Sequence, residues 1–345
     1  MRITFFLLFF FSACQFKETA KPKTNEHIIG KTMGTTYSIK YGLEYGVKIT
    51  KAEIDSILVS INDAVSTYEP ASIISTFNQH AGDFSLPLRK FPAEHFLKNY
   101  QISRQIYEET AGNFDPTVMP LVNYWGFGYT EKKPVLKADS MKIEATMQSV
   151  GLNKLETKTT NQEIIFLKKD ENLALDFSAI AKGYAVDFLA ETMASRQVKN
   201  FMIEIGGEVR TRGINDKGSA WKIGINKPQA DAALNSLEWV VALENVSMAS
   251  SGNYRNFYEV HGQTYGHEIN PLTGYPESTD LLGVSVIHRE CIYADAYATA
   301  FMVMGLEKSL KHAEKNGEIE VCFISAEDGK LKSTFTSGFE SYLVE

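Results

Sequence analysis

The segment from Asp176 to Asp187 combines charged side chains with the pattern of a strand that leads into a helix. Apolar residues alternate up to Phe177, as in a half-buried strand, and then recur every fourth position from Ile180. Ser178 stands where the helix N-cap is expected. A helix start offers free backbone N–H groups and the positive end of a dipole, and Lys182 adds a cation, so this junction could bind phosphate. An ordinary strand-to-helix connection with a solvated lysine fits the same pattern.

Two further sets of residues could carry chemistry. Asp295 and Thr299 are four residues apart in a segment, 293–305, that is expected to form an apolar helix, so their side chains share one face. A carboxylate and a hydroxyl are hard oxygen ligands of the kind that Mg²⁺ accepts beside phosphate and water. An aspartate that favours the helix dipole and a threonine bonded to its own backbone would fit equally. His267 precedes a Pro/Gly turn and is either a catalyst or a packed side chain.

Composition indicates a folded globular protein. The chain has 345 residues, of which 44% are hydrophobic and 22% are charged. A net charge of -7 argues against nucleic acid as the main partner. After residue 26 there is no internal repeat, low-complexity segment or linker, so residues 27–345 are expected to form one domain.

The first residues have the features of an export signal. Arg2 is followed by an apolar run from Ile3 to Phe11 that is too short to span a bilayer. The sequence Phe11-Ser12-Ala13-Cys14 resembles a bacterial lipobox, in which the cysteine is lipidated; a conventional signal peptide that ends near Ala13 is the alternative. We therefore expect a lipoprotein signal peptide at 1–13, a lipid on Cys14, and a flexible tether at 14–26. The protein would be exported and membrane-anchored, facing the periplasm.

Apolar spacing predicts both helices and strands along the rest of the chain. Helical spacing occurs at 54–65 and 96–106. Alternation predicts strands at 35–41, 201–205, 221–225, 239–243, 246–249, 257–260, 264–269, 282–288, 318–324 and 332–335. Residues 250–252 are expected to form a turn, and 112–118 and 125–128 aromatic loops. Cys291 and Cys322 lie in apolar runs, which favours two buried thiols over a disulfide.

Seven blocks of residues occur in the order found in the ApbE family of bacterial FAD:protein FMN transferases, which this sequence resembles over nearly all of its length after the tether. The blocks are Met33-Gly34-Thr35, Ser66-Thr67-Tyr68, Asn113-Phe114-Asp115-Pro116, Asp176 to Asp187, Gly206-Gly207, His267 with Pro271, Thr273 and Gly274, and Ala294-Asp295-Ala296 with Ala298-Thr299-Ala300. The resemblance implies an α+β fold with mixed β-sheets flanked by helices. It also implies a cleft between two halves that holds FAD and Mg²⁺.

The resemblance carries site roles onto individual residues. Asp295 and Thr299 match the side-chain metal ligands, Ala179 matches the backbone-carbonyl ligand, and His267 matches the histidine beside the flavin site. The positions that contact FAD are Met33, Tyr68, Asn113, Phe114, Asp115, Asp176, Lys182 and Ile269. Two blocks depart from the common pattern. Phe177-Ser178-Ala179 replaces Leu-Gly-Gly, and His267-Glu268-Ile269-Asn270 replaces His-Ile-Ile-Asp, which puts an acid–base role for the Asn270 position in doubt.

The activity implied by the resemblance is Mg²⁺-dependent transfer of FMN from FAD to a Thr or Ser hydroxyl of an acceptor protein, with release of AMP. His267 and Asp176 are both candidates for the base that takes the hydroxyl proton. The acceptor would be a flavoprotein subunit of a membrane redox complex, of the Nqr or Rnf kind. Two alternatives remain, a Mg²⁺-dependent FAD pyrophosphatase and an FAD-binding lipoprotein without chemistry. Asp295 and Thr299 argue against the second, since storage needs no metal at the pyrophosphate.

Overall fold

The computed structural model describes most of the chain after the first 24 residues. The described residues are 25–43, 47–89, 91–128, 135, 137–228, 236–252, 257–260, 263–266, 268–277, 281–327 and 330–344. The predicted signal peptide, Cys14 and most of the predicted tether lie outside them, as does His267. The first strand begins at Asn25, slightly before the expected start of the folded part. Within the described ranges, no helix is both long enough and apolar enough to cross a bilayer.

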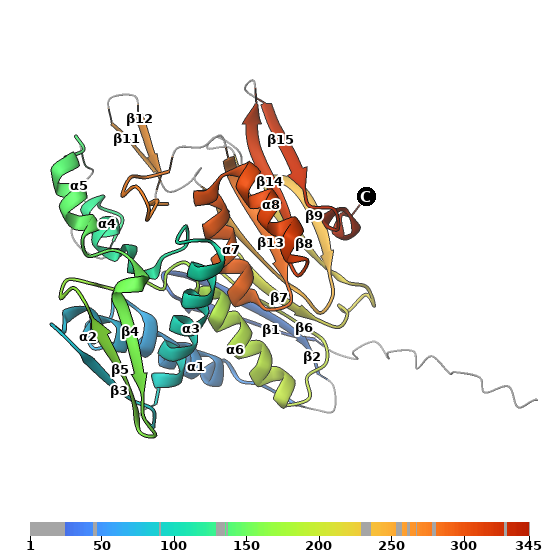
Figure 1. Cartoon of the computed structure of the whole chain (residues 1–345). Helices are drawn as coiled ribbons and strands as arrows, with labels where there is room; N and C mark the ends of the chain where they lie inside the picture. Colours follow the sequence, from blue (N-terminus) through green and yellow to red (C-terminus); the bar gives the residue numbers. More distant parts are fainter. Residues whose placement is uncertain are drawn as a thin grey trace, which may run out of the picture.

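An eight-stranded sheet forms the centre of the fold (Figure 1). Its strands, in spatial order, are β1 (Asn25–Thr32), β2 (Thr35–Gly42), β6 (Phe201–Ile205), β7 (Glu208–Arg212), β10 (Ser247–Gly252), β13 (Leu281–His288), β14 (Glu320–Glu327) and β15 (Lys330–Phe335). Every pairing in this sheet is antiparallel in the described residues. The combination of this sheet with helices confirms the expected α+β class.

Helices cover one face of the sheet and a β-hairpin covers the other. The helices are α1 (Lys51–Val65), α3 (Ala93–Glu109), α6 (Ala181–Ser195), α7 (Cys291–Met304) and α8 (Leu306–Asn316), and the hairpin is β8 (Trp221–Asn226) with β9 (Leu237–Leu243). Neighbouring residues of one strand point to opposite faces, so Val286 packs in the larger core under the helices and Ile287 in a smaller core under the hairpin.

Smaller units surround this body. A three-stranded sheet contains β3 (Phe84–Pro87), β5 (Glu163–Lys168) and β4 (Leu155–Thr159), and β11 (Phe257–Val260) pairs with β12 (Gln263–Gly266). The remaining helices are α2 (Ile73–Gln79), α4 (Met119–Tyr124), α5 (Ser140–Met147) and three 3₁₀ turns, η1 (Pro116–Val118), η2 (Leu152–Lys154) and η3 (Phe339–Tyr342). A third apolar core around Trp125 joins α4 and α5 to the segment that contains Ile269.

Most of the expected elements are present, and three corrections follow. Residues 250–252, predicted as a turn, continue β10, because their backbone pairs in register with Ser285, Val284 and Gly283 of β13. The loop predicted at 112–118 contains η1, and α4 follows it. The helices α2, α5 and α8 were not predicted, although Gly317 (φ +70°) at the C-cap of α8 is a typical helix-stop signal. Both cysteines are free and buried, as expected.

Candidate active site at the start of helix α6

The side chains of residues 173–177 alternate between buried and partly buried, as in a strand, but this segment belongs to no described sheet. The side chain of Asn78 bonds both backbone groups of Leu175: Nδ2 donates to the carbonyl at 2.8 Å, and Oδ1 accepts from the N–H at 2.7 Å. The N–H of Asp176 donates to the carbonyl of Pro116 at 2.7 Å. The strand predicted here is therefore wrong, because a side chain and a loop make the hydrogen bonds that a neighbouring strand would make.

The N-cap of α6 is Ile180, and the prediction of Ser178 is wrong. Ser178 donates its backbone N–H and its hydroxyl to Oδ1 of Asp176, at 2.8 and 2.5 Å. This local turn uses the polar groups of Ser178 before the helix begins. No side chain caps the helix at Ile180, and the N–H of Gly183 in the first turn donates to Oδ2 of Asp295 at 2.9 Å.

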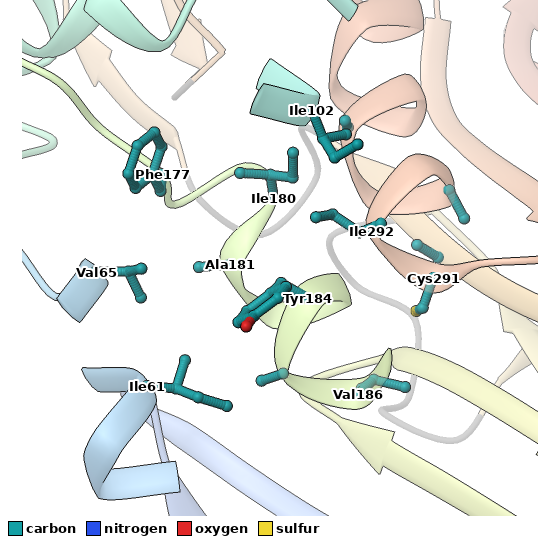
Figure 2. Packing of buried hydrophobic residues seen from close by; sticks show 14 of the residues in the cluster. Ile61, Val65, Ile102, Phe177, Ile180, Ala181, Tyr184, Val186, Cys291 and Ile292 are labelled. Carbon is teal, nitrogen blue, oxygen red and sulfur yellow. The ribbon is translucent and has the colours of Figure 1, made fainter. Parts of the chain in front are cut away.

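Helices α6 and α7 touch at Gly183. A Cβ on this residue would lie 2.5 Å from the carbonyl oxygen of Cys291 and 2.8 Å from the Cβ of Asp295, so only glycine permits the approach. Figure 2 labels side chains near the starts of both helices: Ile180, Ala181 and Tyr184 by α6, and Cys291 and Ile292 on α7. The close crossing brings the carboxylate of Asp295 to the start of α6.

Lys182 lies between two buried carboxylates. Its Nζ is 2.8 Å from Oε1 of Glu208 and 3.5 Å from Oδ1 of Asp295, and these acidic side chains are only 3% and 4% exposed. Burial by itself would lower the pKa of Lys182, but Asp295 and Glu208 raise it above its usual range. Burial raises the pKa of Glu208 and Asp295 adds to that rise, whereas the Lys182 ammonium opposes it because its charge favours the ionised carboxylate. With both carboxylates ionised, this cluster carries more negative charge than one ammonium neutralises.

Two tight turns border this cluster. Gly206 (φ +64°) lies between β6 and β7, where a Cβ would be 2.8 Å from Cγ2 of Thr35 and 3.4 Å from Cδ of Lys182. Thr35 follows the turn between β1 and β2, in which Met33 has φ +48°. Met33 itself is partly buried against the larger core. The structure therefore brings the first and fifth of the seven sequence blocks beside Lys182.

Thr299 lies one turn after Asp295 on α7, and its Oγ1 is 3.3 Å from Oγ of Ser251 on β10. Ala179 is partly buried just before α6. Among the described residues, no group of three or more His, Cys, Asp or Glu side chains could hold a metal ion by itself. A buried carboxylate and a nearby hydroxyl still fit Mg²⁺, which also takes carbonyl, phosphate and water oxygens. In addition, Oε2 of Glu208 is buried without a hydrogen bond from another described residue, which leaves one acidic oxygen of the cluster without a protein partner.

Tyr68 and Asp176 form a second part of the site. Tyr68 is 63% exposed although it precedes the apolar helix α2. Partial burial of its hydroxyl and the negative charge of Asp176 raise the pKa of Tyr68, so the hydroxyl lies within the electrostatic range of that carboxylate. Burial raises the pKa of Asp176 too, and the hydrogen bonds from Ser178 oppose that rise. An exposed aromatic ring beside the helix start is suited to contact with a planar ligand.

The block at 113–115 is mostly internal. Phe114 is buried in the larger core. Oδ1 of Asp115 accepts from the N–H and hydroxyl of Thr117, at 2.8 and 2.6 Å, and Oδ2 accepts from the N–H of Leu152 at 3.2 Å. The carboxylate of Asp115 is thus occupied in holding η1 and η2, and Asn113 is the partly exposed member of this block.

Ile269 and Asn270 also lie in a structured turn. Ile269 is buried in the third core with Trp125, whose Nε1 donates to the carbonyl of Gly274 at 2.8 Å. Nδ2 of Asn270 donates to Oε2 of Glu277 at 2.7 Å. Asn270 therefore belongs to the hydrogen bonds of the turn.

Two residues of the cluster were not predicted from the sequence. Glu208 directly follows the Gly206-Gly207 pair, which already indicated a close approach of backbone, and an acidic residue beside that pair is the signal that could have identified it. Ser251 was assigned to a turn, and no local pattern relates it to Thr299, which is 48 residues away.

A small cavity lies beside the β6–β7 turn. Its volume is about 90 Å³, and it is lined by Gly207, Asn226 and Ser251 among others. Pockets for small molecules usually enclose roughly 300–1,000 Å³, so this cavity alone does not accommodate FAD.

Comparison with known proteins relates this arrangement to one family. The model of the ApbE family matches residues 33–323. The FAD:protein FMN transferase of Vibrio cholerae is 36% identical over 334 residues, which make up 94% of this chain and 94% of that protein. The FAD:protein FMN transferase of Haemophilus influenzae is 36% identical over 322 residues, covering 92% of this chain and 90% of that protein.

Solved structures agree with this relationship. The flavin transferase ApbE from Vibrio cholerae superimposes with a TM-score of 0.80 at 36% identity, covering 93% of this chain and 99% of that chain. The apo form of the Pseudomonas stutzeri flavinyl transferase ApbE superimposes with a TM-score of 0.81 at 30% identity, covering 92% of this chain and 96% of that chain. Because the matches extend over nearly the whole of both partners, this chain belongs to the ApbE family.

Proposed function

We propose that this protein transfers FMN from FAD to a Thr or Ser hydroxyl of an acceptor protein. In this reaction the acceptor oxygen bonds to the FMN phosphorus, the bond from that phosphorus to the bridging oxygen breaks, and AMP leaves with that oxygen. The hydroxyl proton passes to a base. The observation that carries the proposal is the Lys182 ammonium, held between Glu208 and Asp295 at the first turn of α6. The shared name of the relatives, FAD:protein FMN transferase, supports the same conclusion.

Each residue of this site has a separate proposed role in phosphoryl transfer. Lys182 would stabilise negative charge on the pyrophosphate as AMP leaves. Asp295, Thr299 and the carbonyl of Ala179 would hold Mg²⁺, which supplies charge neutralisation and orientation when bound. Tyr68, with its exposed ring, would contact the flavin nucleotide next to Asp176. Met33, Asn113, Phe114, Asp115 and Ile269 remain further proposed FAD contacts.

The base is proposed to be Asp176 or His267. Oδ1 of Asp176 is held by Ser178, which orients the carboxylate, and burial raises its pKa, which improves its strength as a base. Replacement of each residue by asparagine and measurement of the pH profile of FMN transfer distinguishes them. The rate of transfer by the unaltered enzyme should fall at low pH, where the base is protonated. The base is the residue whose replacement removes this fall in rate.

The proposal is tested by incubation of the soluble domain with FAD, Mg²⁺ and an acceptor domain. FMN transfer yields a fluorescent acceptor band that survives denaturation, a mass increase of one FMN less water, and one AMP per modified acceptor. Acceptor Thr→Val is the matched control and should abolish labelling. Release of free FMN and AMP with an unlabelled acceptor would support the pyrophosphatase alternative, and binding of FAD without release of AMP would support a storage protein.

We further propose that the enzyme acts at a membrane surface. The lipobox-like sequence at Cys14 and the polar tether after it support an exported lipoprotein that faces the periplasm. A tethered domain can reach exported or membrane-bound redox proteins, so the proposed acceptor is a flavoprotein subunit of an Nqr- or Rnf-like complex. Labelling of such a subunit from the same cell, and loss of labelling when the tether is removed in vivo, would test this assignment.

A further inference from the structure

Glu208 is a buried acid in the site to which no role has yet been assigned. It is the first residue of β7 and directly follows the tight β6–β7 turn. Its side chain is 3% exposed, and Oε1 accepts from Nζ of Lys182 at 2.8 Å. No other described residue bonds Oε2, which is buried. Removal of a carboxylate from water lowers the stability of the fold unless other groups pair with its charge. The burial of Glu208 is therefore explained best by a role in the site.

The distances around Lys182 suggest what that function is. Nζ of Lys182 is closer to Glu208, at 2.8 Å, than to Asp295, at 3.5 Å. Asp295 also accepts from the N–H of Gly183, which holds its carboxylate in place independently of the lysine. A cation at Asp295 and an ammonium at the same carboxylate compete, because each is attracted to the same negative charge and they repel each other. A second anion would remove that competition.

We propose that Glu208 is a positioning residue that holds the Lys182 ammonium away from Asp295, so that Asp295 is available to a divalent cation while Lys182 stays charged beside the phosphate. This inference deepens the proposed function, because it explains how one small site holds an ammonium and a divalent cation together. It concerns this chain's own charges and is measurable without flavin transfer.

The test is a double-mutant cycle on cation binding, with Mn²⁺ as the probe because it accepts the same oxygen ligands as Mg²⁺. Binding is followed by loss of the free Mn²⁺ signal in electron paramagnetic resonance, without nucleotide or acceptor, because ADP and FAD bind Mn²⁺ themselves. In Glu208→Gln the lysine has only Asp295 as an ionic partner, so the dissociation constant for Mn²⁺ should rise by roughly tenfold or more.

The decisive comparison is Lys182→Met in two backgrounds. If Glu208 keeps the ammonium from competing, Lys182→Met should improve Mn²⁺ binding far more in the Glu208→Gln protein than in the unaltered one. Equal factors in both backgrounds would mean that Glu208 acts only as a distant charge, and would overturn the proposal. Absence of Mn²⁺ binding by the unaltered protein would overturn it as well.

Two further variants separate this role from a structural one. Glu204→Gln removes a carboxylate from the same hairpin, where Oε1 of Glu204 accepts from the N–H of Gly207, and should leave Mn²⁺ affinity within about twofold. Glu208→Asp keeps the charge but shortens the side chain, so it should weaken Mn²⁺ binding if contact with Lys182 matters and should not if charge alone matters. If Glu208→Gln fails to fold, Glu208→Asp takes its place in the comparison with Lys182→Met. Because FAD turnover is not measured, these results stand or fall separately from the proposed transfer reaction.

Discussion

Asp187 of α6 caps the start of α7 at Cys291, a residue 104 positions later in the chain. Oδ1 of Asp187 accepts from the backbone N–H of Cys291 at 2.9 Å, and Oδ2 accepts from that of Ile292 at 2.8 Å. Arg210 on β7 donates to the same carboxylate at 2.8 Å. The N-cap residue of α7, Glu290, makes no capping hydrogen bond with its side chain, so Asp187 of the neighbouring helix supplies the cap. This contact fixes the start of α7, and therefore the position of Asp295, relative to α6.

Asp187→Ala should therefore destabilise the protein strongly. The change removes the buried carboxylate that pairs with the partly buried Arg210, and it removes two hydrogen bonds from the start of α7. Breaking such a pair costs about 3–5 kcal/mol. The free energy of unfolding in urea measures the effect. Glu191→Ala is the control, because Glu191 bonds the same arginine from an exposed position and should cost less than about 1 kcal/mol. Similar losses in the two variants would contradict the capping role.

Gly183→Ala should separate α6 from α7. The added methyl would overlap the carbonyl of Cys291 and the Cβ of Asp295, and overpacking of this kind costs about 1–3 kcal/mol. FMN transfer should fall more than stability explains, because Asp295 moves relative to Lys182. Thermal unfolding and the rate of AMP release measure the two effects. Gly283→Ala is the matched control, since a Cβ there meets nothing nearer than 3.7 Å. A Gly183→Ala protein as active as that control would show that the helix crossing does not set the site.

Asp295→Ala should lower Mg²⁺-dependent turnover by roughly a hundredfold or more, because it removes the proposed charged ligand of the metal. FAD should still bind through Tyr68 and the start of α6. Turnover is measured as AMP release, and binding as the change in flavin fluorescence. Near-normal Mg²⁺-dependent release of AMP by this variant would refute the metal-site assignment.

Cys14→Ser should abolish lipid attachment. A serine hydroxyl does not replace the thiol in lipidation, so the precursor should remain uncleaved and take up no labelled palmitate in cells. Fractionation should then find less of the protein with the membranes. Continued incorporation of palmitate into the variant would contradict the lipobox assignment.

Local sequence determined much of the fold and part of the site. The helical repeat placed Asp295 and Thr299 one turn apart on α7, because the period of a helix follows from its backbone geometry. Alternation likewise predicted most strands of the central sheet. The same alternation misled at Leu175, which belongs to no described strand and whose backbone groups are bonded by the side chain of Asn78. A periodic pattern reports the local backbone shape and does not report which group supplies the hydrogen bonds.

Only the tertiary structure decided which charges meet. The β6–β7 hairpin carries Glu208 to Lys182, and the crossing of α6 and α7 at Gly183 carries Asp295 to the same ammonium. These residues lie far apart in the chain, and their contact depends on how the helices pack on the sheet. The sequence alone determined what each side chain could do chemically, whereas burial and the distances between the charges exist only once the core has formed.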